Sequence, residues 1–257
     1  MFAALSGSHF KILTYNIHKG FSASNRRFIL HGIKAALQEV NADVLFLQEI
    51  QGEHQRHSLR IENWPDNGQP EFLADNIWPH HVYGKNAIYD KGHHGNAILS
   101  KYNFCEWENI NVSLMKTASR SLLHGTLKIP HIAPNIHVIC VHLGLFGYER
   151  ERQLEQLIKR IHSHVPENEP LIIAGDFNDW QNKAERHLNN ILGVKEVFKD
   201  KHGQHARTFP ARLPVLPMDR IYTRGLEVID CRPLRGNPWR RLSDHLPLVS
   251  EFMLNDG

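Results

Sequence analysis

The stretch PLIIAGDFN, residues 170–178, joins an apolar run directly to a glycine, a carboxylate and an amide. Residues 170–174 predict a buried strand, because a short apolar run bounded by turn residues is typical of the interior of a sheet. Gly175 lets the backbone approach a ligand closely at the point where Asp176 and Asn178 follow. Since α/β folds place their chemistry at the ends of strands, we expect a functional site here.

Strands and helices alternate on both sides of this stretch. Apolar runs predict further strands over 10–15, 44–47, 96–99, 122–129, 136–141, 220–222, 226–229 and 246–254. Apolar residues at helical spacing predict helices over 26–39, with Asn25 as N-cap, over 71–77 and over 149–164. The polar residues 51–70 predict a long surface loop. This alternation predicts an α/β or α+β fold with large sheets.

The composition is that of one globular domain with a sizeable core. The 257 residues are 41% hydrophobic and 22% charged, and no low-complexity linker divides them. We therefore expect a single domain over residues 1–257. The net charge of +3 suits an anionic substrate without identifying one.

The cysteine content and the lack of targeting segments predict a cytoplasmic location. The three cysteines are an odd number without a CxxC pair, which fits a reducing compartment. The first residues do not have the pattern of a secretory signal, and no run approaches the roughly 18 apolar residues of a membrane span. We expect no integral membrane contact, and the sequence indicates no protein partner. The 19 histidines lack the spacing of a structural zinc site.

Polar side chains recur at the C-terminal ends of the predicted strands. These residues are Asn16, Glu49, His142, Asp176, Asn178, Asp219, Asp244 and His245. Mg²⁺ supplies a common cause, because it prefers carboxylate and amide oxygens and leaves coordination positions for a substrate phosphate. Glu49 on a rigid strand end suits the ligand role, and Asp219 and Asp244 add charge directly or through bound water. We expect a Mg²⁺ site in which Mn²⁺ can substitute.

Hydrolysis of a phosphate ester also needs an activated water and stabilisation of an anionic transition state. Asp176 beside Asn178 suits a base and a residue that orients it. Asp244 precedes His245, and adjacent side chains on a strand point in opposite directions. If this segment is a loop, Asp244 can orient the imidazole and hold it charged near phosphate.

Six strings occur in the order found in one known family. They are TYNIHKG (14–20), LQE (47–49), GNAILS (95–100), GDFND (175–179), LPMDRIY (216–222) and LSDHLPL (242–248). With these strings the chain resembles the endonuclease/exonuclease/phosphatase superfamily, and its small bacterial stand-alone members in particular. The resemblance covers residues 10–253. It implies a four-layer sandwich of two packed mixed β-sheets flanked by helices.

The resemblance also implies a role for each matching residue. The side chains expected at the reacting phosphate are Asp176, His142, His245, Asn178 and Asp244. Those expected at the metal are Glu49, Asn16, Asp219 and Asp244. Within these sets Asp176 activates water, His142 assists the leaving group, and His245 contacts the scissile phosphate. Arg120 resembles a phosphate-binding arginine.

A basic segment precedes the last motif. Residues 201–245 contain nine Lys and Arg against four acidic residues, and Trp239, Arg240 and Arg241 stand just before the closing Asp-His pair. A basic surface with a stacking ring suits a nucleic-acid backbone, and it suits a phospholipid head group as well. The expected substrate-binding residues are Arg120, Asn178, Trp239, Arg240 and Arg241.

Simpler explanations stand beside these roles. Asn16 could do no more than end a strand, Asp219 could pair with Arg220 or Arg224, and Arg120 and the basic segment could be solvated surface.

The leading functional expectation is a Mg²⁺-dependent phosphodiesterase or nuclease. The alternatives are a phosphatase or phospholipase-type hydrolase of a small phosphoester or lipid head group, and a scaffold that binds phosphate esters without cleaving them. A calcineurin-like metallophosphoesterase is disfavoured, because the N-terminal Asp-x-His and the Gly-Asn-His-Glu of that family do not occur.

Overall fold

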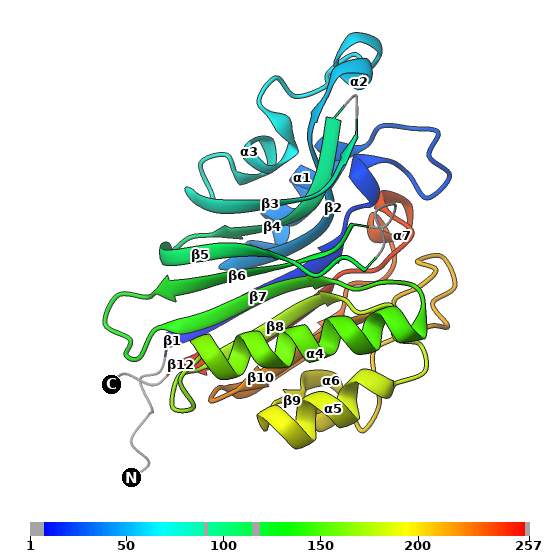
Figure 1. Ribbon diagram of the computed structural model, residues 1–257. Helices are drawn as coiled ribbons and strands as arrows, with labels where there is room; N and C mark the ends of the chain where they lie inside the picture. The colour runs from blue at the N-terminus through cyan, green and yellow to red at the C-terminus, as the bar shows by residue number, and fades with distance from the viewer. Residues whose placement is uncertain (1–7, 90–91, 115–118, 255–257) are drawn as a thin grey trace.

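The computed structural model describes residues 8–89, 92–114 and 119–254, which form two six-stranded sheets packed face to face between helices (Figure 1). The first sheet has the order β11 (Glu227–Pro233), β12 (Leu248–Leu254), β1 (Ser8–Asn16), β2 (Val44–His54), β4 (Gly92–Ser100) and β3 (His80–Tyr89). The second has the order β5 (Asn103–Asn111), β6 (Ser121–Lys128), β7 (Ile136–His142), β8 (Leu171–Asp176), β10 (Asp219–Arg224) and β9 (Lys195–Glu196). Each sheet has one parallel pair, β1–β2 or β7–β8, among antiparallel neighbours. The predicted sandwich of two mixed sheets is confirmed.

Helices cover the outer faces of both sheets. The first sheet is covered by α1 (Leu30–Val40) and α3 (Gly68–Ala74), and the second by α4 (Gly147–His164) and α5 (Lys183–Leu192). The shorter helices are η1 (His18–Gly20), α2 (Gln55–Arg60), α6 (Val197–His202) and α7 (Trp239–Leu242). Within the described ranges, every helix is too short or too polar to cross a membrane.

Side chains alternate between the two faces of each central strand, and this alternation separates an inner core from two outer cores. In β1, Phe10 and Ile12 enter the core between the sheets, whereas Leu13 packs with α1. In β8, Ile172 and Ala174 enter the same inner core. The inner row of each strand therefore points toward the opposite sheet.

The predicted start of the first helix is wrong. Helix α1 begins at Leu30, four residues later than expected, and Ile29 rather than Asn25 occupies the N-cap position. Phe21 and Phe28 form an isolated antiparallel bridge and an edge-to-face ring contact. The residues between them are therefore a turn and cannot continue the helix.

The predicted loop over residues 51–70 is also wrong. Strand β2 continues to His54 because its polar end pairs with β4, with Gln51 opposite His94. Helix α2 follows directly, and α3 begins at Gly68, three residues before the predicted helix. The strand prediction depended on apolar residues. The polar residues at the end of β2 pair within the sheet without showing that signal.

A chain of hydrogen bonds runs between β6, β7 and α4. Nε of Arg160 donates to Nδ1 of His124 at 3.0 Å, Nε2 of His124 lies 3.0 Å from Nδ1 of His137, and Nε2 of His137 lies 2.7 Å from Glu169. Because arginine can only donate, each histidine accepts at Nδ1 and donates from Nε2. Burial and the guanidinium lower the pKa of His124 to about 3, so this imidazole is neutral.

Candidate active site

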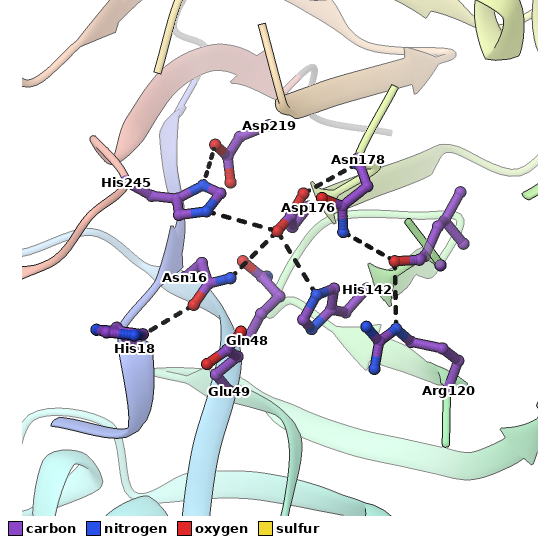
Figure 2. Close-up of polar contacts among 12 residues, drawn as sticks. Asn16, His18, Gln48, Glu49, Arg120, His142, Asp176, Asn178, Asp219 and His245 are labelled. Carbon is purple, nitrogen blue, oxygen red and sulfur yellow. Dashed lines mark hydrogen bonds and ion pairs between the residues drawn. The ribbon is translucent and has the colours of Figure 1, made fainter. Parts of the chain in front are cut away.

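Three central strands end in polar side chains that continue the inner rows. Every second residue of β1, β7 and β8 faces the other sheet, so Asn16, His142 and Asp176 take the last inward positions. All three are buried. Because β1 belongs to the first sheet and β7 and β8 to the second, these side chains meet at one edge of the sandwich (Figure 2).

Asp219 and His245 reach the same edge from strands of opposite direction. The expectation that Asp219 ends a strand is wrong, since it is the first residue of β10. Strand β10 is antiparallel to β8, so its start lies beside the end of β8, and Asp219 is directly opposite Asp176 in the register. His245 lies just before β12, which is antiparallel to β1.

Asp176 is the centre of the polar network at this edge (Figure 2). Its Oδ2 accepts from Nδ2 of Asn16 at 3.1 Å, and its Oδ1 accepts from the backbone N–H of Asn178 at 2.9 Å. The Nε2 atoms of His142 and His245 lie 3.6 and 3.8 Å from Oδ2. Groups that come from both sheets thus surround Oδ2, and the backbone of Asn178 holds Oδ1.

Asp219 and His245 form a buried ion pair beside Asp176. Nδ1 of His245 donates to Oδ2 of Asp219 at 2.8 Å. Burial alone would lower the pKa of His245, but the carboxylates of Asp219 and Asp176 raise it to about 10. Burial raises the pKa of Asp176 to about 7, with repulsion from Asp219 adding to the rise and the charged imidazole opposing it. An imidazole that is charged at neutral pH therefore lies beside a carboxyl group with a pKa of about 7.

Glu49 enters the site from a bulge inside β2 and not from a strand end. The register with β4 shifts between Leu47 and Ile50, and Glu49 has a left-handed φ of 54°. Its carboxylate lies 3.5 Å from the ammonium of Lys19. Burial would raise the pKa of Glu49, but the charge of His142, which is protonated only in the acidic range, and that of Lys19 hold it at about 2. Glu49 is therefore ionised.

Two buried carboxylate oxygens of the site fit a divalent cation. Among the described residues, Oδ1 of Asp219 and Oε2 of Glu49 are buried without a hydrogen bond, and the charged neighbour of Oε2 is the Lys19 ammonium at 3.5 Å. Buried anionic oxygens need a partner, and Mg²⁺ takes oxygens of this kind. The amide of Asn16 lies on the same side of the site as Glu49 (Figure 2).

Asp176, Asp219 and His245 also lie close enough together to hold an ion. However, both ring nitrogens of His245 face carboxylates, and its charged form has no lone pair for a metal. The Glu49 side of the site is therefore the better position for a cation.

Arg120 lies at the site, next to His142. Its Nε and the Nδ2 of Asn178 both donate to the carbonyl oxygen of Leu143, at 3.2 and 2.9 Å. Burial, together with the nearby guanidinium, holds the pKa of His142 well below its ordinary value. The imidazole of His142 is therefore neutral, in contrast to that of His245.

The carboxylate that orients His245 is Asp219 and not the adjacent Asp244. Oδ1 of Asp244 accepts from the hydroxyl of Ser243 and lies 4.0 Å from Nδ1 of His18. Residues 244 and 245 do lie outside a strand, as the expectation for Asp244 required. However, the contacts of Asp244 are with Ser243 and His18, whereas the ring of His245 faces Asp219 and Asp176.

Trp239 is buried, so the expectation that it stacks on a substrate is wrong. It packs against Tyr15 with ring centroids 5.7 Å apart, because α7 turns its apolar side into the outer core. Arg240 and Arg241 are exposed on the same helix. A role for these two arginines in substrate binding stays a prediction.

His94 is a site residue that the sequence patterns do not single out. Burial and Lys19 lower its pKa to about 4, and Glu49 opposes this shift, so a neutral imidazole stands near both groups. Its Nδ1 is buried and has no hydrogen-bond partner among the residues that the structure describes. The position directly before the string GNAILS (95–100) is the signal that could have found it.

Comparisons with known proteins agree with this geometry. Residues 13–245, which include the whole site, match the model of the Endonuclease/Exonuclease/phosphatase family. YbhP of Escherichia coli (strain K12) is 46% identical over 245 residues, which cover 95% of this chain and 96% of that protein.

Solved structures share the fold at low sequence identity. The endonuclease/exonuclease/phosphatase from Bacteroides vulgatus superimposes with a TM-score of 0.74 and 17% identity, over 96% of this chain and 99% of that chain. D. rerio TDP2, solved with a single strand DNA product, superimposes with a TM-score of 0.66 and 19% identity, over 95% and 99% of the two chains.

Proposed function

Because this chain belongs to the endonuclease/exonuclease/phosphatase family of phosphoester hydrolases, we propose that it is a Mg²⁺-dependent phosphodiesterase acting on nucleic acid. Mn²⁺ is expected to replace Mg²⁺. The observation that carries the proposal is the convergence of both sheets on Asp176, with the His245–Asp219 ion pair beside it and buried carboxylate oxygens of Glu49 and Asp219 that have no hydrogen bond.

Asp176 is the proposed base that takes a proton from the attacking water. A pKa of about 7 keeps a large share of the carboxylate ionised at neutral pH while it remains basic enough to accept a proton. The N–H groups of Asn16 and Asn178 fix the direction in which the carboxylate points.

His245 is the proposed stabiliser of the anionic transition state. A cation that Asp219 already holds in place needs no reorganisation when negative charge develops on the phosphate. The neutral imidazole of His142 is proposed to donate a hydrogen bond to the leaving oxygen. Asn178 and Arg120 are proposed to hold the phosphate.

Glu49 and Asn16 are the proposed metal ligands, with Asp219 and Asp244 adding negative charge. When bound, Mg²⁺ supplies positive charge that polarises the phosphate. The low pKa of Glu49, about 2, keeps this carboxylate available as a ligand.

A hydrolysis panel on the full chain tests the proposal. The substrates are single-stranded DNA, plasmid DNA, RNA, bis-p-nitrophenyl phosphate, inositol phosphates and phospholipid vesicles, each with Mg²⁺ and with EDTA. Asp176→Asn is compared with Asp200→Asn, an exposed aspartate on α6. We expect Mg²⁺-dependent cleavage of phosphodiesters, and a loss of about 10²–10⁴-fold in kcat for Asp176→Asn only.

Three results would refute the proposal. Full activity of Asp176→Asn would remove the proposed base. Turnover of inositol phosphates or phospholipids alone would move the function to a phosphatase or phospholipase-type hydrolase, and binding without turnover would indicate a scaffold.

A further inference from the structure

Three exposed aromatic side chains stand beside the catalytic edge. Phe146 and Tyr148 follow the end of β7, are 56% and 58% exposed, and stack with ring centroids 6.1 Å apart. Trp180, two residues after Asn178, is 39% exposed. Exposed apolar groups that gather in one place mark a binding surface, whereas scattered ones do not. We call these three residues the aromatic rim.

A buried arginine joins the two parts of the aromatic rim. NH1 of Arg150 donates to the carbonyl oxygens of Gly144 and Leu145 at 3.2 and 2.6 Å, and its guanidinium lies 4.9 Å from the ring centroid of Trp180. One face of the indole is therefore covered by Arg150, while the residue remains 39% exposed. Arg150 forms no ion pair with a carboxylate of the described residues, and its buried guanidinium is held by the two backbone carbonyls.

A groove of about 1070 Å³ begins at Trp180 and runs between α5 and residues 203–217. Its walls carry amide side chains, among them Asn182, Asn189 and Gln204. Amides can both donate and accept hydrogen bonds, which suits sugars and the edges of bases. The volume exceeds what a small ligand requires.

The groove is also basic. Lys183, Arg186 and Arg207 line it, and none of the three forms an ion pair within the described part of the chain. Two acidic residues line the groove as well. Glu185 is paired with the ammonium of Lys199, which is 2.6 Å away, and lies 3.0 Å from Nε2 of His205, whereas Glu151 forms no ion pair among the described residues and offsets one of the three basic charges. The remaining charge is complementary to a chain of phosphates.

The lining of the groove comes within two residues of the catalytic edge at two points along the chain. Trp180 lines the groove and Asn178 contacts Asp176, while Pro217 lines the groove and Asp219 pairs with His245. The two segments are fastened together by the buried Arg220, an alternative partner considered for Asp219. Its guanidinium donates to the Asp179 carbonyl, the Asn182 side chain and the Pro217 carbonyl.

We propose that the aromatic rim and the groove bind the part of a single-stranded nucleic acid that extends beyond the scissile phosphate. Bases stack on the exposed part of Trp180 and on Phe146, and phosphates lie along Lys183, Arg186 and Arg207. A duplex hides its base faces and cannot use the rim. A lipid surface is a poorer match, because the groove that Trp180 lines is walled by amide and charged side chains. As a statement about substrate class, this rests on the proposed function.

Paired measurements on the full chain separate binding from cleavage. Trp180→Ala and Phe146→Ala are compared with Trp107→Ala, a 51% exposed tryptophan on β5. Arg186→Gln is compared with Arg152→Gln, which is exposed on α4. Cleavage is measured with Mg²⁺ on a single strand of about 12 nucleotides, its duplex and bis-p-nitrophenyl phosphate, which is too small to reach the rim. Binding of the labelled strand is measured by fluorescence anisotropy in EDTA.

Loss of the stacking ring is expected to weaken single-strand binding and kcat/KM by about 5- to 150-fold, as typical base–aromatic stacking implies. Hydrolysis of bis-p-nitrophenyl phosphate and both control variants are expected to stay unchanged. For Arg186→Gln, the slope of the logarithm of the binding constant against the logarithm of the salt concentration is expected to become smaller by about one, since one counterion fewer is released.

The inference is overturned if Trp180→Ala binds and cleaves the single strand as Trp107→Ala does, or if the duplex binds as well as the single strand. It is also overturned if the rim variants lose binding to anionic vesicles and keep their binding to DNA. Binding of the strand through Trp180 without turnover of any phosphodiester would instead refute the proposed function and leave this inference in place.

Discussion

Replacing Asp219 with asparagine removes the carboxylate that holds His245 charged. The rise in the pKa of His245 from 6.5 to about 10 corresponds to roughly 5 kcal/mol in favour of the imidazolium, and Asp219 is the strongest of the groups that cause it. In Asp219→Asn the effect of burial, which lowers the pKa of His245, is opposed mainly by the carboxylate of Asp176. The pKa of His245 is therefore expected to fall to 6.5 or below. Asparagine keeps the size of the side chain and its hydrogen-bond acceptor.

The pH dependence of kcat/KM on bis-p-nitrophenyl phosphate checks this reasoning. In the wild type, activity is expected to rise as Asp176 loses its proton near pH 7 and to fall only as His245 loses its proton near pH 10. In Asp219→Asn the alkaline limb is expected to move below pH 7, with a loss of about 10²–10⁴-fold above it. Circular dichroism is the control for folding. An unchanged alkaline limb would refute the role of the ion pair, even if the overall rate fell.

Glu49→Gln is expected to weaken Mg²⁺ binding by at least about 10- to 100-fold in a calorimetric titration, and an unchanged affinity would contradict its role as a ligand. Gly175→Ala is expected to lower the free energy of unfolding by roughly 2–6 kcal/mol, because φ is +151° and a Cβ would lie 1.9 Å from the Val141 carbonyl. Gly147→Ala, whose Cβ meets nothing, is the control in the same urea titration, and an equal effect would disprove the clash. The folded chain keeps His124 neutral down to about pH 3, whereas the unfolded chain binds a proton near 6.5, so stability falls as pH drops through this window. Between pH 6.5 and 5 this loss is about 2 kcal/mol in urea unfolding, and an equal loss in His124→Gln would assign it to other groups.

The sequence was sufficient to predict the strands that carry the site, because the apolar runs 10–15 and 170–174 are followed by Asn16 and by Gly175-Asp176. Since side chains alternate along a strand, Asp176 shares a face with Ile172 and Ala174, and Asn16 shares one with Phe10 and Ile12. A period of two fixes which side chains share a face before any neighbouring strand is known. This is why most of the residues expected at the site do meet at one edge.

The sequence was not sufficient where position depends on contacts between distant segments. The bulge at Glu49 is visible only in the pairing of β2 with β4, and Asp219 finds His245 only because β10 runs antiparallel to β8. The residues around Trp239 are basic and indicate an exposed segment, yet the Trp239 ring packs against Tyr15. The pattern of residues along one segment does not show which side chains of distant segments will pack against it.

The proposed catalytic groups are also ties between two separate layers. Asn16 and His245 belong to one sheet and Asp176 and Asp219 to the other, and the hydrogen bonds Asn16–Asp176 and His245–Asp219 cross the gap. A small sliding of the layers would stretch these bonds without exposing the core. The rate of turnover should therefore depend strongly on how the two sheets are aligned. On heating, we expect activity to be lost at a lower temperature than secondary structure.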